Sequence, residues 1–216
     1  MRMGKTMKAA IFDMDGTLID SMGAWRSMNA SFLREQGIYV SEEQEEDLRS
    51  MTGRMVVDYA KEHFGVETEF ETLVSRAVKT MEPAYLAGMP LKPGAKAYLQ
   101  RLGERGVKRA LCTATHSRLA LIALNRMDLV RELDYIICLD MIGGSKSDPA
   151  VFDRVCEIIG EKNADCVMFE DAVYAMRGAR EAGLGVIAIT DETNIRDRDE
   201  ILAVCDRMID SYDELE

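Results

Sequence analysis

The chain has 216 residues, of which 47% are hydrophobic and 30% charged, and its 27 basic against 38 acidic residues give a formal net charge of −11. That balance argues against sequence-independent binding of nucleic acid, and no run approaches the ~18 apolar residues of a membrane span. Five cysteines without a Cys-x-x-Cys pair, and an N-terminus without a long apolar stretch, predict a cytoplasmic protein in a reducing compartment.

The first predicted element is a buried strand over residues 8–12, bounded and apolar, with Asp13 and Asp15 directly after it. Because alternate residues of a strand point to the same side, we expect the two carboxylates to project together, and Gly16 lets the chain turn sharply. Two like charges this close resist joint ionisation unless a cation lies between them. The alternative is a pair of solvated loop aspartates, since Asp and Gly both favour turns.

A helical block follows, from residue 21 to about residue 88. Ser41 and Gln44 form a capping box that opens its second helix. The other three helices are marked by apolar stripes over residues 25–33, 54–64 and 70–81. Stripes of this kind are typical of the core of a small bundle, more often than of a binding surface.

After Pro90–Gly94, a predicted hinge linker, short apolar runs alternate with helical stretches. The runs cover residues 107–112, 135–138, 166–169, 185–189 and, more weakly, 207–209. Such alternation predicts βαβ units and a parallel sheet, which is an α/β fold. The first strand has no partner before residue 107, so the helical block is predicted to be an insert in that fold.

Polar groups of a consistent type follow the predicted strands. They are Asp13 and Asp15, then Thr113, Thr115 and His116, then Lys146, and finally Glu170 and Asp171. Because the ends of parallel strands converge on one crevice, we expect these groups to meet there. Taken singly, each has a plainer alternative. Lys146 would be solvated, and Thr113, Asp148 and the pair Glu170–Asp171 would be helix caps.

Together, these residue types suit phosphoryl transfer. Four carboxylates supply the hard oxygen ligands that Mg²⁺ prefers, and a carboxylate can attack phosphorus to form an aspartyl-phosphate. A neighbouring acid can give and take the proton of the leaving group. Lys146 and Thr113 offer a positive charge and a hydroxyl donor to the phosphoryl oxygens.

The segment Phe12–Ser21 resembles the first signature of the haloacid dehalogenase superfamily, in its phosphatase branch with a small helical cap. Thr113, Lys146 and Glu170–Asp171 resemble the second, third and fourth signatures, in that order. The resemblance spans essentially the whole chain. It implies a Rossmann-like doubly wound parallel sheet core over residues 1–19 and 89–216, with an inserted four-helix cap domain over residues 20–88.

The resemblance also implies roles. Asp13 would be the nucleophile and Asp15 the general acid and base. Mg²⁺ would be held by Asp13, the backbone carbonyl of Asp15 and Asp171, with Glu170 directly or through water. The phosphate would be bound by Thr113, Ala114 and Lys146.

Two positions separate the activities within this superfamily. Dehalogenases of this type lack an acid at the position of Asp15, so Asp15 favours hydrolysis of phosphate esters, whose leaving group needs a proton. Trp25 stands where related β-phosphoglucomutases commonly have a histidine. We therefore expect a Mg²⁺-dependent phosphatase acting on a small phosphorylated metabolite. The alternatives are a phosphomutase acting on a sugar phosphate and, more distantly, a non-enzymatic phospho-accepting signalling module.

Four residues of the predicted cap are candidates for substrate contact: Gly23, Trp25, Arg49 and Arg54. For each, the alternative is an ordinary core or surface position. No pattern in the sequence indicates an oligomeric state.

Overall fold

The computed structural model describes residues 7–48, 51, 53–67 and 69–215. Within these ranges six parallel strands form one sheet, in the order β3-β2-β1-β4-β5-β6. The strands are β1 (Ala9–Phe12), β2 (Lys108–Thr113), β3 (Tyr135–Cys138), β4 (Cys166–Glu170), β5 (Gly185–Ile189) and β6 (Arg207–Ile209). The predicted α/β fold is confirmed. Strand β2 starts and ends one residue later than predicted, and β4 includes Glu170.

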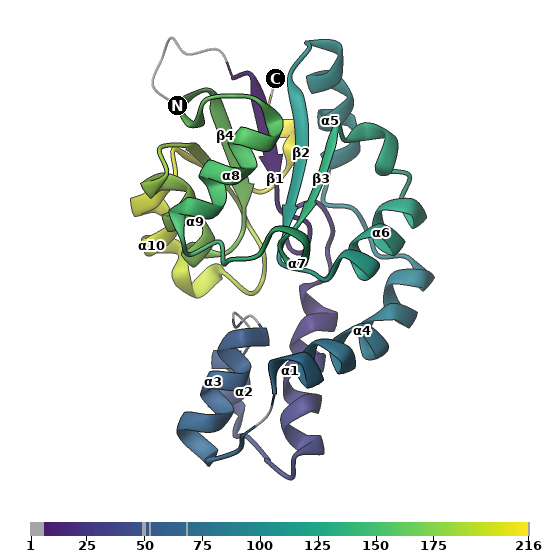
Figure 1. Ribbon diagram of the computed structural model, residues 1–216, viewed down its shortest axis with the longest axis vertical. Coiled ribbons are helices and arrows are strands. Elements are labelled where there is room, and N and C mark those ends of the chain that lie inside the picture. Colours follow the sequence, from purple (N-terminus) through teal and green to yellow (C-terminus); the bar gives the residue numbers. More distant parts are fainter. Residues whose placement is uncertain (1–6, 49–50, 52, 68, 216) are drawn as a thin grey trace.

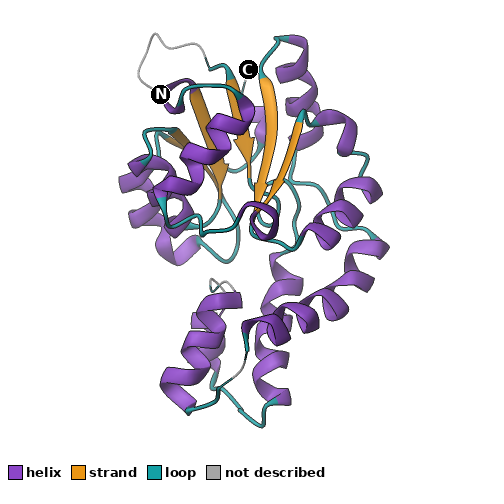
Figure 2. Ribbon diagram, in the orientation of Figure 1, coloured by secondary structure: helices purple, strands orange, loops and turns teal. Residues whose placement is uncertain are grey.

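Helices cover both faces of the sheet (Figures 1 and 2). One face carries α5 (Ala95–Glu104) and α6 (Ser117–Arg126), and the other carries α8 (Pro149–Ile159), α9 (Val173–Glu181) and α10 (Arg198–Val204). Short helices fill the connections: α7 (Leu139–Ile142), η1 (Val130–Glu132), η2 (Asn163–Asp165), η3 (Ile195–Asp197) and η4 (Tyr212–Glu214). Successive residues of β1 belong to two different hydrophobic cores, because Ile11 packs on one face of the sheet and Phe12 on the other.

An aromatic cluster fixes the central strands at the end where the chemistry is expected. Phe12 lies opposite Phe169 in the register of β1 and β4, and their rings stack with centroids 4.5 Å apart. Tyr98 from α5 and Tyr212 from η4 pack on the same pair. Their burial holds the ends of β1 and β4 in a fixed relation.

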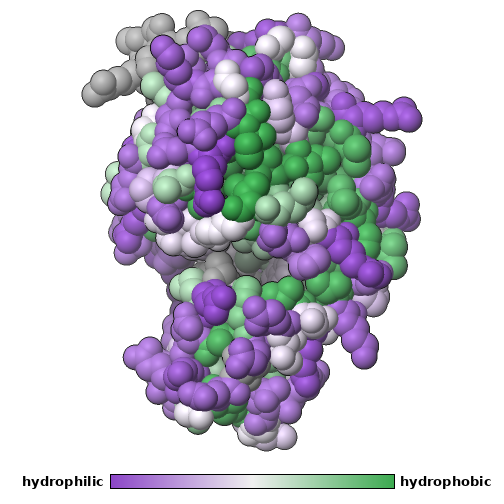
Figure 3. Space-filling model, in the orientation of Figure 1, coloured by the Kyte–Doolittle hydropathy of each residue, from purple (hydrophilic) through white to green (hydrophobic). Residues whose placement is uncertain are grey.

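The described part of the segment between β1 and α5 contains four helices: α1 (Met22–Glu35), α2 (Glu42–Leu48), α3 (Gly53–Phe64) and α4 (Phe70–Ala87). The capping box before α2 is confirmed, because the Ser41 N–H donates to Gln44 Oε1 at 2.9 Å and the Gln44 N–H donates to Ser41 Oγ at 3.3 Å. The strands point their carboxyl ends toward this insert, whose visible face is largely hydrophilic (Figures 2 and 3). The domain limits at residues 19/20 and 88/89 stay a prediction.

Helix α4 belongs to the insert at its start and contacts the α/β part at its end. Arg118 of α6 forms an ion pair with Glu82 at 2.9 Å, and Arg126 Nε donates to the Leu86 carbonyl oxygen at 3.1 Å. The last turns of α4 are therefore tied to α6.

No helix in the described part of the chain is long and apolar enough to cross a membrane.

The two connections between the insert and the sheet run side by side. The Asp20 N–H donates to the Pro90 carbonyl, and the Lys92 N–H donates to the Leu18 carbonyl, each at 2.9 Å. The Lys92 ammonium then forms an ion pair of 2.6 Å with Asp191, in the loop after β5, and both side chains are largely buried. This pair pins the second connection to the sheet.

We expect Lys92→Met to lower the free energy of unfolding by about 3 to 5 kcal/mol, because it leaves the Asp191 carboxylate buried without its cation. Burial works against ionisation of Asp191, but the hydrogen bond from Lys92 holds the pKa of that carboxyl below its ordinary value. The stabilisation is therefore present above about pH 4 and is lost as the pH falls through the folded-state pKa.

Urea unfolding of both proteins between pH 3 and pH 7 measures this effect. The control is Lys8→Met, which removes an exposed ion pair with Asp165 and should leave the unfolding midpoint nearly unchanged. Equal midpoints for the Lys92 and Lys8 variants at pH 7 would contradict the assignment.

Candidate active site

Asp13 directly follows β1 at the centre of the sheet. Its N–H donates to the Phe169 carbonyl at 3.0 Å, so the ladder with β4 extends one residue past Phe12. The chain then turns, and Asp15 lies in this turn instead of in a longer strand. Gly16 has a φ of +79°, and a Cβ there would lie 2.3 Å from Asp171 Oδ2. The turn therefore needs glycine both for its backbone and for the close approach of Asp171.

Lys146 reaches the site from the loop between α7 and α8. Its side chain is 2% exposed, and its ammonium donates to Asp13 Oδ1 and, at 2.8 Å, to Glu170 Oε2. Burial opposes its charge, but Asp13 and Glu170 raise the pKa of Lys146 well above its ordinary value. The alternative of a solvated lysine is therefore wrong, and Lys146 is a fixed cation between two carboxylates.

Asp13, Glu170 and Asp171 form a cluster in which one carboxylate oxygen from each lies within 4.8 Å of the others. Burial and the charges of Glu170 and Asp15 raise the pKa of Asp13 to about 8, although Lys146 opposes the shift. Burial and the charges of Glu170, Asp13 and Asp191 raise the pKa of Asp171 well above its usual range. The cluster thus holds three buried carboxylates and one ammonium, that of Lys146, which contacts two of them. Their hard oxygen donors and excess negative charge fit a divalent metal ion.

Other side chains hold Asp171 and Glu170 in place. Thr17 Oγ1 donates to Asp171 Oδ1 at 2.9 Å, and Asn194 Nδ2 donates to the Asp171 carbonyl at 3.0 Å. Glu170 Oε1 accepts from the N–H groups of Asp171 and Ala172, each at 3.2 Å. The helix-cap alternative is therefore wrong for this pair, because the N-cap of α9 is Ala172 and no side chain caps it. One oxygen of Glu170 holds the turn before α9, while the other accepts from Lys146.

The residues predicted to bind phosphate lie at the end of β2 and in the loop that follows it. Thr113 is buried, and its Oγ1 accepts from the Thr115 N–H at 3.0 Å, so it keeps its own proton to donate. His116, not Thr113, is the N-cap of α6. Ala114 lies exposed between the two threonines. The helix-cap alternative is thus wrong for Thr113, whereas it is confirmed for Asp148, which accepts from the Ala150 N–H at 3.0 Å.

Asp15 takes a different set of partners from Asp13. Its Oδ1 accepts from the hydroxyls of Ser21 and Tyr85, and its Oδ2 accepts from Thr115 Oγ1 at 2.6 Å. None of these three donors has a role in the predictions from sequence. Two of them carry a sequence signal, since Ser21 is the last residue of the first signature and Thr115 follows a predicted strand. Tyr85 continues the apolar stripe of α4 four residues after Met81, and only the rule that a buried phenol needs a partner singles it out.

The structure places three of the four candidate substrate contacts. Gly23 is exposed in the first turn of α1, and Trp25, half-buried two residues later, donates from Nε1 to the Tyr85 hydroxyl at 3.0 Å. Arg54 is exposed, with its guanidinium 3.9 Å from the centroid of the Phe70 ring. Arg49 lies outside the described residues. The roles of all four in substrate binding stay predictions.

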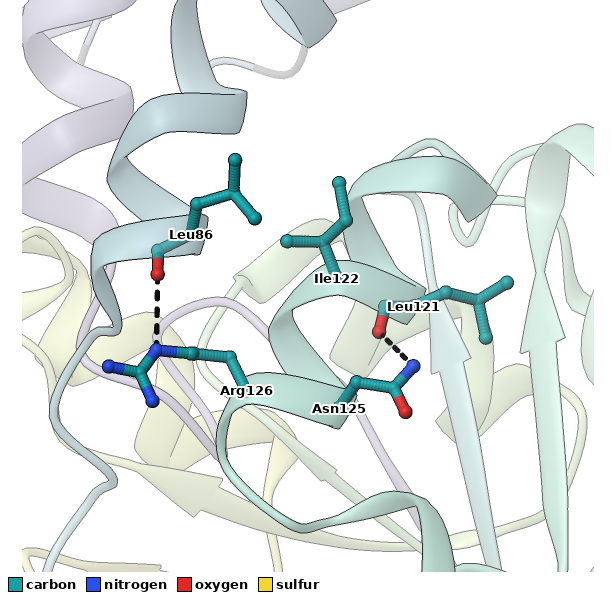
Figure 4. A pocket seen from close by; sticks show the side chains of 5 residues that line it. All are labelled: Leu86, Leu121, Ile122, Asn125 and Arg126. Atoms are coloured by element: carbon teal, nitrogen blue, oxygen red, sulfur yellow. Dashed lines mark hydrogen bonds between the residues drawn. The ribbon is translucent and has the colours of Figure 1, made fainter.

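A shallow pocket of about 430 Å³ lies elsewhere, where the end of α4 meets α6. Figure 4 shows the side chains that line it: Leu86, Leu121, Ile122, Asn125 and Arg126. None of the clustered acids lines this pocket, so it is separate from the candidate site.

Known proteins resemble this chain in sequence and in fold. A profile of the haloacid dehalogenase-like hydrolases matches residues 7–183. A phosphorylated carbohydrates phosphatase of Thermotoga maritima is 25% identical over 178 residues, which cover 82% of both chains. Hexitol phosphatase B of Escherichia coli is 28% identical over 187 residues, covering 84% of this chain and 82% of that one. The crystal structure of CbbY from Rhodobacter sphaeroides in complex with phosphate matches with a TM-score of 0.83 at 21% identity, over 97% of this chain and 96% of the other, which shows a shared fold.

We predict that Gly178→Ala destabilises the protein, against the usual gain from Gly to Ala inside a helix. A Cβ at Gly178 of α9 would lie 2.0 Å from the carbonyl oxygen of Lys146, so the backbone that presents Lys146 has to move. We expect a loss of about 1 to 3 kcal/mol in the free energy of unfolding.

Gly23→Ala in α1 is the matched control, because a Cβ there meets nothing within 4 Å. It should gain up to about 1 kcal/mol. Chemical unfolding of both variants decides the matter, and a stabilised Gly178→Ala protein would show that α9 does not pack this closely on the Lys146 loop.

Proposed function

The chain belongs to the haloacid dehalogenase-like hydrolases, and from this premise we propose that it is a Mg²⁺-dependent phosphatase that works through an aspartyl-phosphate on Asp13. The expected phosphoric monoester hydrolase of this superfamily is confirmed, which sets aside the non-enzymatic alternative. The observation that carries the finer proposal is the contact of the Lys146 ammonium with Asp13 inside a buried acidic cluster. The Lys146 ammonium there favours the ionised, nucleophilic form of Asp13, and a bound divalent cation would favour it further.

The metal would be held by Asp13, Asp171 and the backbone carbonyl of Asp15. Glu170 already accepts hydrogen bonds from Lys146 and two backbone N–H groups, which favours a supporting role for it, through water. When bound, Mg²⁺ supplies positive charge to the phosphoryl oxygens. Lys146, the Thr113 hydroxyl and the exposed loop at Ala114 would bind the remaining oxygens.

In the first step, a carboxylate oxygen of Asp13 attacks phosphorus and the bond from phosphorus to the ester oxygen breaks. Protonated Asp15 gives its proton to the departing alkoxide. In the second step, Asp15, now a carboxylate, takes a proton from a water molecule that attacks phosphorus, and the bond to Asp13 breaks. The products are an alcohol and inorganic phosphate, and both aspartates return to their starting forms.

The substrate we propose is a small phosphorylated carbohydrate or polyol. The names of two relatives support this class, since one is a phosphorylated carbohydrates phosphatase and the other a hexitol phosphatase. A phosphomutase is the second candidate. It is disfavoured because Trp25, at the position where β-phosphoglucomutases commonly have a histidine, uses its N–H on Tyr85 and offers no basic nitrogen.

Asp13→Asn tests the nucleophile. We expect kcat on a hexose or hexitol phosphate to fall at least ~10³-fold, because an amide does not attack phosphorus. Asp20→Asn is the matched control, since Asp20 is exposed in the same segment, and it should keep full activity. Substantial activity in Asp13→Asn would rule out the aspartyl-phosphate.

Removal of divalent metal tests the acidic cluster. Activity should be lost after treatment with a chelator and return on addition of Mg²⁺, because Asp13, Glu170 and Asp171 otherwise repel an anionic substrate. Steady-state rates before chelation, after it, and after titration with Mg²⁺ measure the effect. Unchanged turnover in metal-free buffer would contradict the proposed cofactor.

A further inference from the structure

Asp15 lies where both connections between the sheet and the insert pass. Ser21 belongs to the first connection, directly before α1, and Tyr85 lies in the last turn of α4, directly before the second. The hydroxyls of both donate to the same atom, Asp15 Oδ1. The α/β part supplies the third donor, Thr115, on Oδ2. The side chain expected to move the proton is therefore held by groups from three separate segments.

Tyr85 is the least expected of these donors. It is fully buried, and its hydroxyl gives its proton to Asp15 while it accepts from Trp25 Nε1 at 3.0 Å. Burial, together with the charge of Asp15, raises the pKa of Tyr85 well above its ordinary value. Because the hydroxyl already accepts from Trp25, its own proton is directed at Asp15.

The part of α4 that carries Tyr85 is fixed to the α/β part. Arg118 pairs with Glu82 one turn before Tyr85. Directly after Tyr85, the carbonyl of Leu86 accepts from Arg126, as Figure 4 shows. Trp25 holds the hydroxyl itself from α1. These contacts hold the last turn of α4, and with it the Tyr85 hydroxyl, beside Asp15.

We propose that Tyr85 is a positioning residue for Asp15, and that Trp25 keeps the Tyr85 hydroxyl aligned. With Ser21 and Tyr85 both on Oδ1, Oδ2 is the oxygen that carries the transferable proton. That proton passes from Oδ2 to the ester oxygen as the bond between phosphorus and oxygen breaks. The inference rests on the proposed function, because it assumes that Asp15 is the general acid.

The test compares substrates that differ in their need for a proton. The leaving group of an alkyl phosphate such as glycerol phosphate is an alkoxide, which departs poorly without a proton. The leaving group of p-nitrophenyl phosphate is a stable phenolate, which departs without help from an acid. The measured quantity is kcat/KM, which covers the steps up to departure of the alcohol and excludes hydrolysis of the phosphoenzyme. In Tyr85→Phe we expect kcat/KM for the alkyl ester to fall about 10- to 100-fold, and that for the aryl ester to fall less than about threefold.

Three further variants separate positioning from packing. Tyr98→Phe alters another buried tyrosine, which packs on Phe12 and Phe169, and should leave the alkyl-to-aryl ratio unchanged. Trp25→Phe should shift the ratio in the same direction as Tyr85→Phe. In an Asp15→Asn background, Tyr85→Phe should have no further effect on the ratio, since both changes act through one group.

The outcomes separate the positioning role of Tyr85 from the general-acid role of Asp15. An equal loss on both esters, or an unchanged ratio in Tyr85→Phe, overturns the positioning role. If Tyr85→Phe does not fold, an unchanged ratio in Trp25→Phe overturns it instead. If Asp15→Asn itself leaves the ratio unchanged, the proposed general acid is wrong and the Tyr85 role fails with it. A selective Asp15→Asn with a non-selective Tyr85→Phe rejects the Tyr85 role alone.

Discussion

The buried ammonium of Lys146, set between Asp13 and Glu170, is the interaction on which the site depends. Without this ammonium the repulsion among the three carboxylates would be uncompensated, and even beside it burial and that repulsion raise the pKa values of Asp13 and Asp171. Much of the surrounding structure holds the Lys146 ammonium in place. The aromatic cluster fixes the ends of β1 and β4, and the loop with Lys146 packs so closely on α9 that only glycine fits at position 178.

The two aspartates after β1 differ through their partners. Asp13 faces Lys146 and the metal cluster, whereas Asp15 faces hydroxyls from both connections of the insert and from the loop after β2. This division follows from the turn that begins after Phe12, because a continued strand would give both side chains the same surroundings. It assigns attack to one residue and proton transfer to the other, and it links proton transfer to the insert.

Much of this arrangement is predictable from sequence. Short apolar runs fix the parallel strands, and polar residues at their ends identify the acids and Lys146, because local patterns and strand direction decide both. The hydrogen bond between Trp25 and Tyr85 cannot be predicted in this way, since both residues lie in apolar stripes typical of a core and they are 60 residues apart. The ion pair of Lys92 with Asp191 cannot be predicted from the sequence either, because it depends on how the second connection packs against the loop after β5.

The central claim is that phosphorus becomes bonded to Asp13 during turnover. Rapid acid quenching of enzyme mixed with a ³²P-labelled substrate, followed by peptide mapping, tests it most directly. The account predicts a transient label on the peptide that contains Asp13 and no label in Asp13→Asn. Turnover without labelled protein, or a label on another acid such as Asp171, would contradict it.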